Sequence, residues 1–199
     1  MPARSSPDLR LGRLRRSDLD AYAGLLEGLA ATRAVLVAGD APERQAGAVG
    51  LATAAAATGR RVALLECDLE RPALADALGL ATAPGLREYL LGEATAEDIL
   101  KPLVLAGPGS VAAEEALVCI VAGRAGGDAD LLLGSERFRH AVASLRGAYE
   151  LLVIDGPPPR VAGGFAAAAA AADAVIAWAA PGEQPPALPV ATIGVVVQR

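Results

Sequence analysis

Six short apolar runs constrain the fold of this chain more than any other feature of its sequence. Each run is mostly aliphatic, and segments with helical character separate most of the runs. The runs cover residues 34–38, 61–66, 117–121, 151–154, 174–178 and 193–197. Strands that are apolar on both faces are typical of a parallel sheet that helices cover on both sides. The sequence therefore predicts an α/β fold with a doubly wound, mostly parallel sheet.

Helix signals divide the chain between these runs. Ser17 followed by Asp20 resembles a capping box, and an alanine-rich segment after the first run ends near Gly59. Further helices are expected at 72–78, 85–91, 95–100 and 135–146. Residues 1–16 are rich in Pro, Ser and Arg and show no periodicity. We therefore expect a mobile tail over 1–16, followed by a single domain over 17–199.

Composition excludes several classes of function. The formal net charge of −5 provides no basic field for nucleic acid or for an anionic membrane surface. Cys67 and Cys119 lie in or next to apolar runs without a CxxC spacing, which favours buried, reduced thiols. The N-terminus has no signal-peptide pattern, and the apolar stretch 161–180 is mostly alanine and contains Asp173. These features predict a cytoplasmic protein with no direct membrane insertion.

The loop after the first run, residues 39–45, has the position of a phosphate cradle. In such a cradle the backbone N–H groups at a helix N-terminus hold an anion. A loop of the GxxxxGK[ST] type also needs a final glycine, a lysine and a hydroxyl. Glu43, Arg44 and Gln45 stand at those three positions, and Gly39 and Asp40 precede them.

These three departures weaken the expected phosphate binding. Lys101 is the only lysine of the chain, so arginine at position 44 by itself is a minor change. A carboxylate at Glu43 would repel a phosphate by about 4 kcal/mol at about 4 Å with an effective dielectric of about 20. The amide of Gln45 is a poorer ligand for Mg²⁺ than a hydroxyl. We therefore expect that the loop does not bind ATP in the ordinary way.

Carboxylates follow two other runs at the same predicted edge of the sheet. Glu66 and Asp68 come at the end of the second run, and Asp155 ends the fourth. Ligands of parallel α/β sheets bind outside the carboxyl ends of the strands. Asp155 in this place can hold Mg²⁺ or orient a nucleophile. The other interpretation is a cap for the proline turn that follows, and the sequence leaves both open.

Four blocks of sequence resemble the bacterial tyrosine autokinases. The blocks are residues 60–72 (RRVALLECDLERP), 85–93 (GLREYLLGE), 135–139 (SERFR) and 148–158 (AYELLVIDGPP), in the family's order. That family consists of P-loop proteins that control capsule and exopolysaccharide polymerisation and export, and it is related to the partition and septum-site ATPases. The resemblance covers roughly residues 17–199 and implies a P-loop NTPase fold.

The resemblance assigns roles to the candidate residues. It makes loop 39–45 the first nucleotide motif, residues 66–70 the second and residues 155–158 the third. It implies catalytic roles for Asp68 and Asp155, nucleotide contacts for Glu66 and the loop, and ATP or ADP with Mg²⁺ as the family's cofactor. By the same resemblance, Asp155 is the position for Mg²⁺.

The departures from the family pattern fall on chemistry and assembly. The second motif is Asp-x-Asp-x-Arg in the family, whereas Glu66 and Glu70 stand at its first and last positions here. Ala23 and Leu26 replace arginines that help the family to assemble a ring. The chain ends at Arg199 without the family's tyrosine-rich tail. A short proline-rich loop replaces the usual helix, with prolines at Pro181, Pro185, Pro186 and Pro189.

Two hypotheses follow from this pattern. The first is a degenerate pseudokinase that needs no cofactor and acts by binding a protein partner in exopolysaccharide or capsule production. The partner would be a membrane polysaccharide copolymerase or an active kinase, which would recruit the chain to the inner face of the membrane. The second is an active, divergent tyrosine autokinase or ATPase in which Arg44 replaces the lysine.

Overall fold

The computed structural model describes residues 8–10, 16–39, 43–106, 117–179 and 194–197. Within these residues, eight strands form one sheet in the order β1-β4-β5-β3-β6-β2-β7-β8. The strands are β1 (Asp8–Arg10), β2 (Ala34–Gly39), β3 (Val62–Glu66), β4 (Lys101–Ala106), β5 (Leu117–Ile120), β6 (Leu151–Asp155), β7 (Ala174–Ala179) and β8 (Gly194–Val197). All neighbouring pairs are parallel except β4 and β5. The expected doubly wound, mostly parallel sheet is confirmed.

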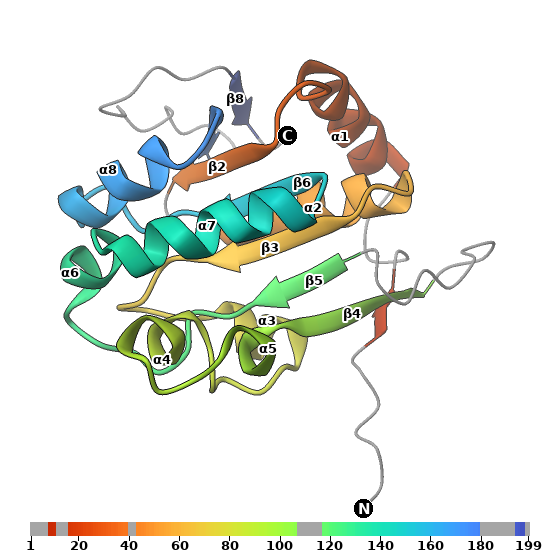
Figure 1. The fold of residues 1–199 in the computed structure, drawn as a ribbon. Helices are drawn as coiled ribbons and strands as arrows, with labels where there is room; N and C mark the ends of the chain where they lie inside the picture. The colour runs from red at the N-terminus through yellow and green to blue at the C-terminus, as the bar shows by residue number, and fades with distance from the viewer. Residues whose placement is uncertain (1–7, 11–15, 40–42, 107–116, 180–193, 198–199) are drawn as a thin grey trace, which may run out of the picture.

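Helices cover both faces of the sheet (Figure 1). One core cluster contains side chains of α1 (Arg16–Gly28), α2 (Glu43–Ala57) and α3 (Leu74–Leu78). The opposite cluster contains side chains of α4 (Leu86–Leu91), α5 (Ala96–Ile99), α6 (Ala129–Leu133), α7 (Glu136–Ala148) and α8 (Ala162–Ala170). The sheet is therefore the middle layer of three.

The central strands supply both cores because successive side chains point to opposite faces. In β2, Val35 and Val37 belong to the cluster with α1 and α2, whereas Leu36 belongs to the opposite cluster. The same alternation occurs in β6, where Val153 and Ile154 face opposite sides. Double-sided burial explains why these strands have no polar face in the sequence.

Four elements were not expected from the sequence. β1 pairs with β4 through residues 8–10, so part of the segment expected as a tail is a strand. β4 contains Lys101 and Pro102, which suit a strand near a sheet edge better than a central one. α6 has only five residues, and α8 contains Gly163 and Gly164, so local propensity for both helices is weak. The proline-rich loop with Pro181, Pro185, Pro186 and Pro189 lies outside the described residues.

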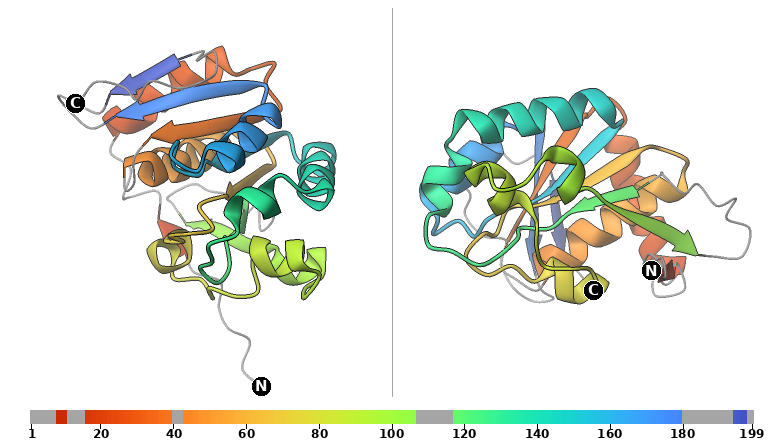
Figure 2. Two further views of the ribbon diagram at one scale, coloured as in Figure 1. Left: turned by 90° about the vertical axis from the view of Figure 1, so that its left-hand side faces the viewer. Right: turned by 60° about the horizontal axis from the view of Figure 1, so that its bottom comes forward.

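The carboxyl ends of β2, β3, β5 and β6 meet at one edge of the sheet. The arrowheads of β2, β3 and β5 point to the left in Figure 1, and β6 is parallel to β2 and β3. The left-hand view of Figure 2 looks onto this edge. Residues Glu66 and Asp155 are register partners on β3 and β6. Val37 of β2 is the register partner of Asp155 on the other side of β6. The sheet register thus brings the three candidate motifs together.

Candidate functional site

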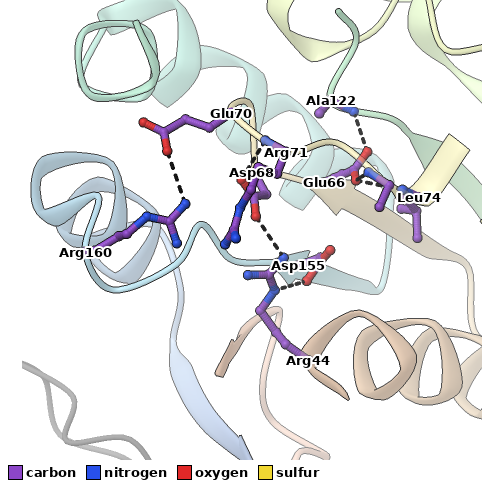
Figure 3. A network of polar contacts seen from close by, with 10 residues as sticks. Arg44, Glu66, Asp68, Glu70, Arg71, Leu74, Ala122, Asp155 and Arg160 are labelled. Carbon is purple, nitrogen blue, oxygen red and sulfur yellow. Dashed lines mark hydrogen bonds and ion pairs between the residues drawn. The ribbon is translucent and has the colours of Figure 1, made fainter. Parts of the chain in front are cut away.

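Arg44 occupies the centre of this edge. It is the second residue of α2, and its side chain is 2% exposed. Its Nε donates a hydrogen bond to Asp155 Oδ1 at 2.6 Å, and its Nη2 donates to Asp68 Oδ2 at 3.3 Å (Figure 3). The side chains of Asp155 and Asp68 are 0% and 1% exposed. One buried guanidinium therefore connects residues from all three predicted nucleotide motifs.

The backbone at Gly39, the last residue of β2, lies close to β7. Gly39 is the register partner of Trp178 on β7, and its φ is 152°, which side chains rarely allow. A Cβ at this position would lie 2.3 Å from the carbonyl oxygen of Trp178. Only glycine fits this close approach of the backbone. The glycine expected at the start of the first motif is therefore required by packing.

Glu66 holds backbone instead of facing the open edge. Its Oε1 accepts hydrogen bonds from the N–H groups of Ala73 and Leu74, each at 2.8 Å. Its Oε2 accepts one from the N–H of Ala122, also at 2.8 Å. Burial raises the pKa of Glu66, against these backbone hydrogen bonds, which lower it. The carboxylate thereby fastens the start of α3 and the segment after β5 to the end of β3.

Asp68 also stabilises a turn, through its second oxygen. Asp68 Oδ1 accepts a hydrogen bond from the N–H of Arg71 at 3.1 Å. Two residues after Asp68, Glu70 forms an ion pair of 3.3 Å with Arg160, which lies in the segment after β6 (Figure 3). Sequence reasoning missed Arg160. The available signal was Glu70, an anion where the resembled family has an arginine, because such an anion can pair with a cation nearby.

The site pairs one guanidinium group, that of Arg44, with two carboxyl groups, those of Asp155 and Asp68. Burial raises the pKa of Asp155 to about 6, and Arg44 opposes the shift. Burial lowers the pKa of Arg44, but Asp155 and Asp68 outweigh it and leave the pKa raised. Arg44 and Asp155 are therefore both charged at neutral pH. Among the described residues, two buried atoms of this site, Arg44 Nη1 and Asp155 Oδ2, have no hydrogen-bond partner.

The remaining candidate residues are placed as follows. Asp40 lies outside the described residues, and for Glu43 only the backbone at the start of α2 is described. Gln45 is partly exposed on α2. Within the described residues, no three His, Cys, Asp or Glu side chains are grouped so that they could hold a metal ion. The contact of Asp155 with Mg²⁺ stays a prediction.

Two expectations outside the site can also be compared with the structure. Cys67 and Cys119 are buried free thiols, and burial raises the pKa of both. In the part of the chain that is described, no helix has the length and apolar character to span a membrane.

The sheet order and the strand–loop–helix unit at its edge define a P-loop NTPase-like fold. Its solved relatives include the septum site-determining protein MinD of Pyrococcus horikoshii with Mg-ADP. That structure has a TM-score of 0.54, is 20% identical, and covers 72% of this chain and 55% of the MinD chain. At this identity the likeness shows the fold alone.

Within this class, the chain is similar to bacterial tyrosine kinases. The kinase domain of VpsO is 25% identical with a TM-score of 0.68, and the match covers 81% of this chain and 78% of VpsO. The kinase domain of Escherichia coli ETK has a TM-score of 0.70 at 18% identity, over 83% of this chain and 65% of that one. The resemblance expected from the sequence is confirmed.

A sequence comparison gives the same relationship. The tyrosine-protein kinase ptk of Acinetobacter johnsonii is 28% identical over 126 residues. These residues are 62% of this chain and 16% of the kinase, so the chain spans a small part of that relative. No family model matches the sequence.

Proposed function

We propose that this chain is a kinase-like P-loop protein that has lost phosphoryl transfer and acts by binding. Its role would lie in the regulation of exopolysaccharide or capsule polymerisation and export. The observation that supports this is the position of Arg44, whose guanidinium is bound to Asp155 and Asp68 instead of being free for phosphate. The similarity to tyrosine kinase domains supports the pathway.

The residues at the site do not fit a magnesium nucleotide in this arrangement. Asp155, which would hold Mg²⁺ by resemblance, and Asp68, which the resemblance makes catalytic, already have the cation Arg44 of the chain itself as their partner. For Arg44 to turn toward a phosphate, two carboxylates would lose their counter-ion while buried. Breaking a buried ion pair in this way costs about 3–5 kcal/mol. A phosphate bound there would also lie close to excess negative charge.

The protein would then work through a partner. We infer a membrane polysaccharide copolymerase or an active kinase as that partner, with this chain in the cytoplasm and recruited to the membrane. This role needs no bound nucleotide or cation to complete the site, because Arg44 already pairs with the carboxylates of Asp155 and Asp68.

One observation favours the alternative of a divergent autokinase or ATPase. Asp68 and Asp155, which the resemblance makes catalytic, both lie within hydrogen-bonding distance of Arg44. The cation and the carboxylates needed for phosphoryl transfer are therefore gathered in one place, although they are bound to one another. A nucleotide able to separate them would restore a working arrangement.

Calorimetric titration with ATP and ADP, with and without Mg²⁺, distinguishes the two proposals. For the wild type we expect no binding and no ATP hydrolysis or tyrosine labelling above background. Asp155→Ala is the control, because it removes the carboxylate that an active enzyme would need. Magnesium-dependent turnover that Asp155→Ala abolishes would establish the enzyme and overturn the pseudokinase.

A restored loop tests the cause of the deficit. The triple change Glu43→Gly, Arg44→Lys and Gln45→Thr returns a glycine, a point charge and a hydroxyl together. We expect weak but measurable ADP binding, because Glu66 and Glu70 remain altered. Arg44→Lys alone should bind no nucleotide, since the carboxylate of Glu43 remains and neither the glycine nor the hydroxyl is returned. No binding by the triple variant would mean that the backbone of the loop has itself changed.

A further inference from the structure

A groove lies between α7 and α8 on the face of the sheet opposite α2. The two helices cover this face together in Figure 1, and the groove has a volume of about 490 Å³. Its apolar lining comes from the end of α6, from α7, and from α8 and the turn after it. These residues are Leu133, Val142, Ala143, Ala167, Ala170 and Ala171.

The groove stays open because α8 carries almost no side-chain bulk. Phe165 is the one large side chain of α8, and it is fully buried in the core beneath the helix. The outer face of α8 has only methyl groups, which cannot reach across to α7. Ala143 and Ala170, on the two sides of the groove, are both exposed. An apolar groove with small side chains allows another backbone to approach closely.

Positive charge lies along one side of the groove. Arg139 and Arg146 are seven residues apart on α7, so they lie on the same side of the helix, about two turns apart. Of the side chains that the structure describes, those that line the groove include these two guanidinium groups and no carboxylate. α7 contains three arginines and one glutamate, in a chain whose net charge is −5. Each of these two arginines has one carboxylate partner, Glu136 or Asp173, and neither carboxylate lines the groove.

The two arginines differ in how firmly they are held. Arg146 donates to Asp173 Oδ1 at 2.6 Å and to the carbonyl oxygen of Ala171 at 2.9 Å, which fixes it against the groove. Arg139 is 64% exposed; its Nη1 donates to the carbonyl oxygen of Gly134 at 3.1 Å, and its ion-pair partner Glu136, at 3.7 Å, is 88% exposed. Such an exposed pair is weak and exchanges readily for another carboxylate. Arg139 is therefore available to a ligand.

We propose that the groove between α7 and α8 binds an amphipathic helix of a partner protein, with acidic side chains along one edge of that helix. The small aliphatic side chains of the partner helix lie on the alanines of α8, and the carboxylates of the partner helix face Arg139 and Arg146. A helix fits because helix-in-groove recognition combines an apolar stripe with a charged edge. This inference rests on the proposed function insofar as the protein acts by binding.

The test uses a synthetic helical peptide labelled with fluorescein. It has Leu and Ala at positions i, i+3, i+4 and i+7 and glutamates along one flank, and a second peptide has lysines in place of the glutamates. Fluorescence anisotropy with the full chain should show binding of the glutamate peptide and none of the lysine peptide. Arg139→Glu should weaken binding about fivefold, because an attractive pair becomes repulsive.

Two further variants make the test specific. Ala170→Phe places a ring in the groove at an exposed position and should weaken binding about tenfold or more, because it removes the space for the peptide. Arg61→Glu is the matched control, because Arg61 is 62% exposed and pairs with Glu150 at 3.7 Å, but does not line the groove. It should bind the peptide as the wild type does.

Several outcomes would overturn the inference. These are equal affinity for the two peptides, equal weakening by Arg61→Glu and Arg139→Glu, or unchanged binding by Ala170→Phe. A wild-type dimer in sedimentation that Ala170→Phe dissociates would show that a second copy of the chain occupies the groove. Circular dichroism confirms that each variant is folded. Nucleotide binding and ATP turnover are measured separately from peptide binding. ATP turnover would overturn the proposed function, whereas the peptide measurements alone decide whether the groove binds a helix.

Discussion

At the residue scale, Arg44 forms two ion pairs while its side chain is buried. We predict that Arg44→Met lowers the free energy of unfolding by about 3–5 kcal/mol, because Asp155 and Asp68 then stay buried without a counter-ion. Urea denaturation at neutral pH measures the effect. Arg61→Met is the comparison, since its exposed, solvent-screened pair with Glu150 should contribute far less. Equal effects of the two changes would contradict the buried pairing.

The raised pKa of Asp155 leads to a prediction about how the free energy of unfolding depends on pH. Its folded-state pKa is raised from 3.8 to about 6, so the folded state binds the proton more tightly than the unfolded state does. The stability that this group contributes is present below about pH 4 and is lost as the pH rises through about 6. Between these limits the wild type should lose up to about 3 kcal/mol relative to Asp155→Asn.

Urea denaturation of both proteins across this pH range measures the difference between them. Exposed carboxylates whose pKa values are lowered, such as Asp98 and Glu150, act in the opposite direction but are present in both proteins. They therefore cancel in the comparison. A difference between the two proteins that does not change with pH would contradict the raised pKa of Asp155.

At the element scale, α1, α2 and β7 meet around one aromatic pair. Tyr22 of α1 and Trp178 of β7 stack with ring centroids 5.9 Å apart. A Cβ at Gly47 of α2 would lie 2.4 Å from the ring of Trp178. The ring of Trp178 thus packs directly against the backbone of α2 at Gly47, near the end of α2 that carries Arg44.

Glycine-to-alanine changes in two helices should therefore have opposite effects. We predict that Gly47→Ala destabilises the protein by about 1–3 kcal/mol, because the methyl group overlaps the ring of Trp178. Gly24→Ala in α1 has no atom within 4 Å of the new Cβ and should stabilise by up to about 1 kcal/mol through helix propensity. Thermal unfolding followed by the fluorescence of Trp178, the single tryptophan, measures both. A stabilising Gly47→Ala would show that α2 does not lie this close to β7.

At the scale of the whole molecule, we predict that the described core folds without a ligand. Buried side chains form one cluster on each face of the sheet, and both clusters run across the central strands. Apolar burial stabilises by about 25 cal/mol per Å². We predict a single cooperative transition in calorimetry of the nucleotide-free protein.

The same measurement with millimolar Mg-ATP should shift the melting temperature by less than about 1 °C, because a ligand that does not bind cannot stabilise. A cooperative transition that appears only after nucleotide is added would contradict the prediction of a self-sufficient fold. It would also favour the enzyme over the pseudokinase.

The sequence by itself determined six of the eight described strands and the candidate motifs. Apolar runs such as 151–154 require burial on both faces, and in a parallel sheet their carboxyl ends meet at one edge. That reasoning placed Arg44, Asp68 and Asp155 at the same edge. β4 escaped prediction because Lys101 and Pro102 interrupt its apolar pattern, which a strand near the sheet edge tolerates. β1 has only three residues, too few to show a period.

Only the tertiary structure decided what Arg44 does. In the sequence it stands where a lysine would bind phosphate, and nothing local distinguishes a free cation from a paired one. Its partners are 24 and 111 residues away along the chain, and the register of β3 and β6 brings them within reach. The energy of a buried charge depends on the groups around it in space. The sequence therefore identified the members of the site, whereas their mutual neutralisation required the fold.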